Sequence, residues 1–331
     1  MKNFDIEKIP RMNLCALPTP IQHLKRLSSN LKSVEIYIKR DDLTGIAFGG
    51  NKNRKLEFLL SDAIKKNCDI IITEGAITSN HCLQTAACAA KIGLDCELVL
   101  SDSHIGNRIS GNLLLDTILD VKIHRVSNSS ERKSKMKERA EILTKEGRRP
   151  YIIPTGGSNA IGSFGYINCF KEIALQSKEL GLTFDYFVIA TGSAGTQAGC
   201  LAGKKIYYPN INVIGINVGD NSKEIIDATK HILSDFEREN HCSLSVKEEE
   251  IIVFDDYFGE GYGIPYQELI DTLKLVAKYE GIFLDPVYNG KAMVGLLDLI
   301  KKKYIKVDSK VLFLHSGGGP AIFSYENYFL K

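Results

Sequence analysis

A lysine follows two glycines at the start of a predicted helix. Residues 49–55 read GGNKNRK, so three cations share one helical turn. The helix dipole disfavours cations at this end, and a bound anion such as a phosphate would remove the conflict. Lys52 could also form an imine with a carbonyl cofactor. Two other interpretations stay open, namely that Asn51 caps the helix and that the cations form a solvated basic turn.

A second polar cluster precedes an Ala-rich helix. Residues 78–81 read TSNH and follow a predicted strand. Backbone N–H groups and small hydroxyls at a helix N-terminus can bind a carboxylate. We therefore predict a substrate carboxylate site at Ser79, Asn80 and His81. The alternative is that Ser79 or Asn80 only caps the helix.

A run of small residues links another strand to a helix. Residues 191–199 read TGSAGTQAG, which favours a phosphate site built from backbone N–H groups. Ala194 stands where the dinucleotide fingerprint has its second glycine, and no Walker lysine follows. The alternative is a tight turn that needs small residues for packing.

Two loops each present one tyrosine, and a serine follows the last strand. Tyr262 lies in the run EGYGIP and Tyr288 in LDPVYNGK. A tyrosine can exchange a proton with a substrate, although both rings could also be loop anchors. Ser316 lies in HSGGGP, where its hydroxyl could bond to an aromatic nitrogen or could simply be a polar turn residue.

The elements that must position these residues alternate between strand and helix. Hydrophobic periodicity predicts strands at 34–39, 70–73, 97–100, 121–126, 151–153, 184–190, 213–217, 251–254 and 311–314, and helices at 51–67, 80–92, 106–119, 131–146, 161–180, 195–207, 222–238, 265–279 and 290–302. This alternation predicts parallel sheets with helices on both faces. The motif-bearing loops then lie at one edge, where ligands bind.

Composition bounds the class of protein. The length of 331 residues predicts about two domains, and the 44% hydrophobic and 25% charged shares exclude a disordered chain. A net charge of +2 gives no case for nucleic acid or a membrane surface as partner. The eight cysteines form no C-x-x-C pair, so we expect reduced core residues and no metal site. No long apolar run or signal peptide is visible, so we expect a cytoplasmic protein.

Together the motifs resemble the D-cysteine desulfhydrase / 1-aminocyclopropane-1-carboxylate (ACC) deaminase family. The resemblance runs from about Leu17 to the C-terminus and rests on residues 49–57, 79–81, 192–199, 285–288 and 315–318. It implies an α/β enzyme that uses pyridoxal 5′-phosphate (PLP), with the two-domain, tryptophan synthase β-like fold of type II. A small domain of residues 50–165 would be inserted into a large domain of residues 1–49 plus 166–331. A homodimer acting on a small amino acid is also implied.

The same resemblance assigns roles to the residues already singled out. It implies that Lys52 bonds to PLP, that Asn80 meets the PLP 3′-oxygen and that Ser316 meets the pyridine nitrogen. The remaining implied contacts are Asn51 and Lys55 beside the cofactor, Ala194, Gly195 and Thr196 around its phosphate, and Ser79, Tyr262 and Tyr288 as catalytic residues.

Two departures from the ACC deaminase pattern bear on the substrate. Asn289 stands where those enzymes carry Glu, and Ser316 stands where they carry an apolar residue. A carboxylate at the pyridine nitrogen would keep the ring protonated, as ring opening demands, whereas a neutral hydroxyl suffices for elimination. We therefore expect D-cysteine to be converted to pyruvate, ammonia and hydrogen sulfide. L-Cysteate sulfo-lyase and ACC deaminase activities are the alternatives.

Two rival functions explain the sequence less well. A nicotinamide dehydrogenase would use residues 192–199 and Asp220, but its glycine spacing is absent and residues 49–55 would have no role. A binding protein without chemistry would have no need of Lys52 and two tyrosines.

Overall fold

The computed structural model describes residues 4–103, 108–219 and 221–330. Gly106, the predicted start of a helix, and Asp220 lie outside these ranges. Within them, six strands form one sheet in the order β1-β2-β10-β7-β8-β9, and four form a second in the order β5-β4-β3-β6. Their bounds are β1 Ile21–His23, β2 Glu35–Arg40, β3 Ile70–Ala76, β4 Asp95–Ser101, β5 Lys122–Val126, β6 Pro150–Ile152, β7 Tyr186–Thr191, β8 Asn212–Asn217, β9 Ile252–Phe254 and β10 Lys310–His315.

The strands pair in parallel, as predicted, except at one edge. β1 pairs antiparallel with β2, so the larger sheet is mixed. β1 was not predicted, because a strand of three partly exposed residues leaves no periodicity to detect. The other predicted strands are confirmed to within a few residues.

The helices also follow the predicted order. Their bounds are α1 Lys25–Leu31, α2 Asn51–Lys65, α3 Asn80–Lys91, α4 Gly111–Ile118, α5 Ser129–Lys145, α6 Ala160–Leu180, α7 Gly195–Tyr207, α8 Ser222–Glu239, α9 Gln267–Glu280 and α10 Asn289–Lys301. α1 was not predicted. α4 begins later than expected, because Ser110 in extended conformation stands at its N-cap.

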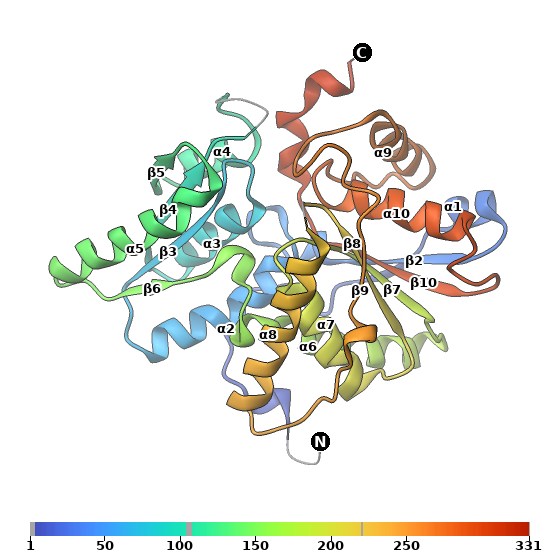
Figure 1. The fold of residues 1–331 in the computed structure, drawn as a ribbon, viewed down its shortest axis with the longest axis horizontal. Helices are drawn as coiled ribbons and strands as arrows, with labels where there is room; N and C mark the ends of the chain where they lie inside the picture. Colours follow the sequence, from blue (N-terminus) through green and yellow to red (C-terminus); the bar gives the residue numbers. More distant parts are fainter. Residues whose placement is uncertain (1–3, 104–107, 220, 331) are drawn as a thin grey trace.

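The two sheets define two lobes. The smaller sheet and helices α3 to α5 form the lobe on the left of Figure 1, and the larger sheet with its helices lies on the right. Helices α2 and α6 pack together where the lobes meet. The strands of the smaller sheet fall inside the predicted segment 50–165, while the domain boundaries at residues 50 and 165 stay a prediction.

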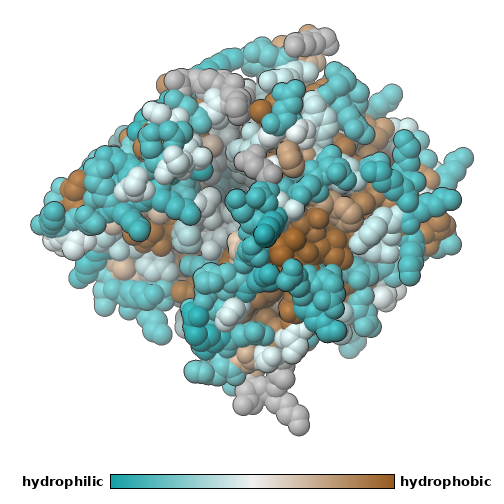
Figure 2. Space-filling model, in the orientation of Figure 1, coloured by the Kyte–Doolittle hydropathy of each residue, from teal (hydrophilic) through white to brown (hydrophobic). Residues whose placement is uncertain are grey.

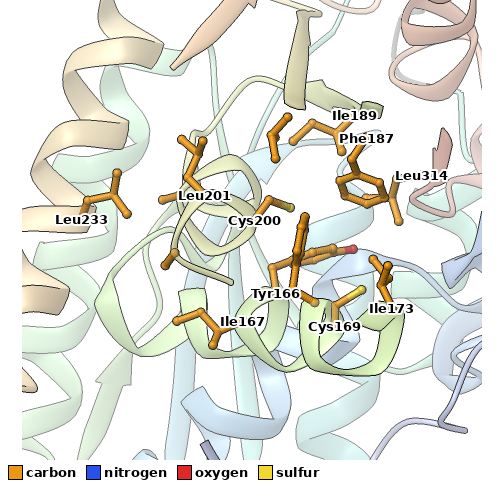
Figure 3. Close-up of a cluster of buried hydrophobic side chains, with 14 of the residues drawn as sticks. Tyr166, Ile167, Cys169, Ile173, Phe187, Ile189, Cys200, Leu201, Leu233 and Leu314 are labelled. Atoms are coloured by element: carbon orange, nitrogen blue, oxygen red, sulfur yellow. The ribbon is translucent and has the colours of Figure 1, made fainter. Parts of the chain in front are cut away.

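The largest apolar core lies between α6, α7 and β7. Figure 3 shows Tyr166 and Cys169 of α6 facing Phe187 of β7 and Cys200 of α7, all of them buried. The helices approach closely because α7 carries glycines, and a Cβ on Gly203 would lie 2.6 Å from the Cβ of Phe170. This packing fixes the start of α7, which bears the predicted phosphate loop.

Cysteines and surface agree with the composition. The eight cysteines are free, and half of them are buried. Hydrophilic residues cover most of the face in Figure 2, with an apolar area right of its centre. Among the described residues, no helix is long and apolar enough to cross a membrane.

Asp116 of α4 is buried without compensation, which predicts a pH-dependent cost in stability. Its Oδ1 has no hydrogen-bond partner among the described residues, and burial raises the pKa of this carboxyl to about 7. The charged form is therefore disfavoured in the fold, so wild-type stability falls as pH rises toward 7. The stability gain of Asp116→Asn over wild type should grow by about 2 kcal/mol between about pH 5 and pH 8.

Thermal or urea unfolding at several pH values measures this difference. Asp271→Asn, which alters an exposed carboxylate of α9, is the matched control and should show no such trend. An equal gain at both pH values would contradict the assignment.

Candidate active site

A pocket lies where the two lobes meet, at the carboxyl ends of β7 and β10. It takes residues from the starts of α2 and α3, from the loop between β7 and α7, and from the segments before α10 and after β10. The lining residues are Asn51, Lys52, Asn80, His81, Ala190, Thr191, Gly192, Ser193, Ala194, Thr196, Tyr288 and Ser316. Most of the predicted site residues are therefore brought together. Ser79, Lys55, Gly195 and Tyr262 are predicted site residues that do not line it.

The cations of the first turn of α2 are not solvated. Arg54 is buried and pairs with Asp41 at 2.8 Å and with Glu172 at 2.9 Å. Lys55 is fully buried and donates to the carbonyl of Gly156 at 3.0 Å. The interpretation as a solvated basic turn is wrong, because the turn packs into the junction between the lobes.

Asn51 does not cap α2. Gly50 stands at the N-cap with φ 144°, and no side chain caps the helix. The side-chain nitrogen of Asn51 instead donates to the Thr196 hydroxyl at 3.1 Å. Asn51 thereby joins the start of α2 to the start of α7.

Lys52 presents its amine to the pocket. Its Nζ lies 3.1 Å from Asn51 Oδ1. Burial lowers the pKa of Lys52 to about 8, although the charge of Asp285 opposes this shift. A neutral, nucleophilic amine is therefore accessible near neutral pH.

Two glycines allow the segment after β10 to cross the start of α2. Gly50 and Gly317 form an isolated bridge, and a Cβ on Gly317 would lie 2.6 Å from the Cα of Gly50. The backbone N–H of Asn51 donates to the carbonyl of Ser316 at 3.0 Å. This crossing brings Ser316 into the pocket that Lys52 lines.

Ser316 is held by Asn289. Asn289 Oδ1 accepts the Ser316 backbone N–H at 2.8 Å and its hydroxyl at 3.0 Å. Asn289 Nδ2 donates to Asp285 at 2.6 Å and to the carbonyl of Gly317 at 2.7 Å. Because that carbonyl only accepts, the orientation of the Asn289 amide is fixed. The Ser316 hydroxyl can turn toward a ligand while Asn289 keeps the backbone N–H.

Ser79 and Asn80 divide two functions between them. Ser79 caps α3, since its Oγ accepts from the backbone N–H of Cys82 at 3.2 Å. The capping alternative is therefore confirmed for Ser79. Asn80, the first residue of α3, lines the pocket. The role of Ser79 in substrate binding and catalysis stays a prediction.

His81 is a neutral, fixed ring on the pocket wall. The Thr73 hydroxyl donates to the carbonyl of Ile153 at 2.8 Å, so His81 Nε2, also at 2.8 Å from this hydroxyl, carries the hydrogen that it donates. Burial, with the charges of Lys52 and Lys55, holds the pKa of His81 well below its usual value. His81 therefore offers no positive charge to an anion.

The turn between β7 and α7 is tightly packed at Gly195 and open at Gly192. A Cβ on Gly195 would lie 2.6 Å from Ser158 Oγ, so packing alone requires a small residue there. A Cβ on Gly192 would have no neighbour closer than 3.4 Å. Ala194 stands at the N-cap of α7 with φ 65° and no side-chain cap. The first N–H groups of α7 thus begin at the pocket wall.

The two tyrosines meet. Their hydroxyls are in hydrogen-bond contact, and their ring centroids lie 5.8 Å apart in an edge-on arrangement. Burial raises the pKa of Tyr262 to about 12 and also raises that of Tyr288 well above its usual value, so both stay protonated. Lys291 Nζ donates to the carbonyls of Phe258 and Gly261 at 2.7 Å each, which holds the loop before Tyr262.

These residues fit PLP. Thr191 lines the pocket, and its hydroxyl is buried without a hydrogen-bond partner in the described part of the chain. The N-terminus of α7 beside it suits a phosphate, and the lysine amine lies across the same pocket. Burial and the charge of Lys52 lower the pKa of Lys55, so an anion bound nearby would favour its charged form.

The fold and the pocket thus define a PLP-dependent enzyme. A family model described as "Pyridoxal-phosphate dependent enzyme" matches residues 13–317, and the chain belongs to this family. It is a PLP-dependent lyase, similar to curated D-cysteine desulfhydrases. The relative from Klebsiella pneumoniae is 42% identical over 327 residues, covering 97% of this chain and 98% of that one. The relative from Yersinia enterocolitica is 43% identical, covering 97% of both chains.

Solved structures agree with this membership. A crystal structure described as an ACC deaminase homologue has a TM-score of 0.91 and 39% identity, covering 98% of this chain and 97% of that one. O-ureido-L-serine synthase shares the fold, with a TM-score of 0.65 and 17% identity over 97% and 94% of the two chains. The family and the α/β fold are confirmed, and the dehydrogenase interpretation is wrong.

Two residues around the pocket were not predicted. Asn112 of α4 contacts Asn80, and Asp285 organises the segment before α10. Nothing in the sequence around Asn112 indicates a site, because Asn112 is a single polar residue followed by three leucines near the start of α4. Asp285 lies in the run LDPVYNGK, in which the prediction gave a role only to the tyrosine, so this motif could have identified it.

The lowered pKa of Lys52 predicts how the protein without cofactor takes up PLP. Only the neutral amine can attack the aldehyde, so the rate of uptake should rise with pH, show a midpoint near pH 8 and then level off. Stopped-flow measurement of the visible absorbance of lysine-bound PLP records this rate. Lys52→Ala should give no such band at any pH. A rate that still rises above about pH 10, where an ordinary lysine titrates, would contradict the shifted pKa.

Proposed function

We propose that the protein catalyses α,β-elimination from a small β-substituted amino acid, with D-cysteine as the preferred substrate. With water, D-cysteine would give pyruvate, ammonia and hydrogen sulfide. The observation that carries the proposal is the identity of 42–43% to curated D-cysteine desulfhydrases over 97% of this chain. Ser316, which lines the pocket, and its neutral partner Asn289 give independent support.

Five residues would hold the cofactor. Lys52 would bond to PLP, and Asn80 and Ser316 would face its 3′-oxygen and ring nitrogen. The N-terminus of α7, from Gly195 to Thr196, would bind the phosphate. PLP supplies an electron sink for the charge that remains on Cα when a proton leaves.

Lys52 would move the Cα proton. Its amine would be available for this role when it is not bonded to PLP, and a pKa near 8 would let Nζ accept and return a proton near neutral pH. The substrate carboxylate would lie at the N-terminus of α3, beside Ser79 and Asn80. There the helix dipole favours an anion. Because the pKa of His81 is lowered, this ring stays neutral and does not transfer a proton to the carboxylate.

Tyr288 is the proposed proton donor to the departing sulfur. Its ring lines the pocket, whereas Tyr262 contacts the Tyr288 hydroxyl from behind. The raised pKa of both phenols keeps a proton available. Tyr262 would then restore the proton that Tyr288 gives up.

The contacts of Ser316 favour elimination over ring opening. The ring nitrogen would meet a hydroxyl whose neighbour, Asn289, carries no charge. The nearest carboxylate in this network, Asp285, is engaged by the backbone N–H groups of residues 287–289. ACC ring opening is the second candidate, because the 39% identical structure is described as an ACC deaminase homologue.

A substrate panel separates these activities. Pyruvate should form from D-cysteine with a higher kcat/KM than from L-cysteine, D-serine or L-cysteate. ACC should give little 2-oxobutyrate, since Ser316 provides no carboxylate at the ring nitrogen. A higher kcat/KM for ACC, or for sulfite release from L-cysteate, would overturn the choice of D-cysteine. Lys52→Ala is the control that detects background elimination by free PLP.

A homodimer is also proposed, on the family resemblance. Light scattering of the PLP-loaded protein at micromolar concentration should give twice the mass of one chain. A single-chain mass under these conditions would contradict it.

A further inference from the structure

We propose that Asn112 is a positioning residue that fixes the amide of Asn80 with its nitrogen toward the pocket. This inference rests on the proposed function, in which Asn80 meets the PLP 3′-oxygen. Asn112 is buried near the start of α4, and Asn80 is the first residue of α3. Asn112 itself does not line the pocket.

The polarity of the pair is set by a backbone carbonyl. Asn112 Nδ2 lies 2.7 Å from the carbonyl oxygen of Thr78 and 2.7 Å from Asn80 Oδ1. A carbonyl oxygen only accepts, so the atom of Asn112 that faces it must be nitrogen. The atom of Asn80 that meets the same nitrogen must then be oxygen. The carbonyl of Thr78 therefore determines which side-chain atom is oxygen and which is nitrogen in both amides.

This orientation directs a donor at the ligand. With Oδ1 bound to Asn112, the Asn80 nitrogen lies on the other side, 3.0 Å from where a Cβ on Gly318 would stand. Gly318 belongs to the segment that brings Ser316 into the pocket. A donor at this position favours an oxygen without its proton on the cofactor ring.

This orientation of the Asn112 amide carries a cost in free energy. Asn112 Oδ1 is buried without a hydrogen-bond partner in the described part of the chain. A buried unpaired acceptor is unfavourable, so the amide would turn if Thr78 and Asn80 permitted it. Both contacts instead hold it in the orientation that exposes the donor of Asn80.

The far lobe holds the start of α4 in place. Ser110 Oγ donates to the carbonyl of Phe323 at 3.0 Å, and Arg108 pairs with Glu326. A Cβ on Gly111 would lie 2.8 Å from the carbonyl oxygen of Pro320. Asn112 is therefore set against the C-terminal segment, and through it the orientation of Asn80 depends on both lobes.

The isosteric variant Asn112→Asp tests the inference. A carboxylate cannot donate, so the Asn80 amide should turn, present Oδ1 to the pocket and leave the 3′-oxygen of lysine-bound PLP protonated. The loaded variant should lose visible absorbance in favour of the near-ultraviolet band by severalfold. Equilibrium dialysis should show about tenfold weaker PLP binding, the effect of one lost hydrogen bond to a charged group. Both readouts need no turnover.

Thr117→Val is the matched control. It removes a hydrogen bond to the carbonyl of Leu113 within the same helix and should keep the wild-type spectrum. If thermal melting shows that Asn112→Asp does not fold, Asn112→Ala, which removes the donor without adding charge, should shift the spectrum in the same direction. A wild-type band ratio in the folded variant would overturn the role of Asn112. Failure of the wild type to take up PLP would instead refute the proposed function.

Discussion

The first turn of α2 carries three cations into the protein interior, and this constraint governs the site. Arg54 is compensated by Asp41, 13 residues earlier, and by Glu172, 118 residues later in the chain. Among the described residues, Lys55 donates to a backbone carbonyl and Lys52 to a neighbouring amide, and neither lysine has a carboxylate partner. Burial therefore lowers the pKa of both lysines, and the charge of Lys52 lowers that of Lys55 further. The same turn thus provides an amine that can bond to a carbonyl, and two lysines whose charged forms a bound anion would favour.

A single buried carboxylate organises the opposite wall. Asp285 accepts the backbone N–H groups of Val287, Tyr288 and Asn289 at 2.8–2.9 Å, together with the side-chain amide of Asn289. These bonds fix the tyrosine hydroxyl that lines the pocket and the amide that holds Ser316. The burial that raises the pKa of Asp285 is partly offset by these donors. The proposed proton donor and the proposed ring-nitrogen contact therefore have a common support.

Local signals predicted the helix starts that form the pocket, but not the contacts between them. The run 191–199 located the start of α7, and the glycines before Lys52 located α2. Capping by Asn51 stayed open as an interpretation, because nothing in the sequence tells that Gly50 adopts φ 144° against Gly317. The partners of Arg54 could not be predicted, since Glu172 lies 118 residues away in the chain. Asn112 was missed for the same reason, because its role depends on where α4 packs.

The contacts that join the two lobes at the pocket are neutral hydrogen bonds, whereas the ion pairs of Arg54 lie behind it. Asn51 reaches Thr196 by its side chain and Ser316 by its backbone, so both links resist a change of pH. Burial lowers the pKa of Lys52 and of Lys55, and Asp285 opposes this shift at Lys52. An anion that enters this space would favour the charged forms of both lysines, and none of the described lining residues is a carboxylate that would compete with it. The protein thereby keeps its geometry constant while the charge of the site responds to what binds.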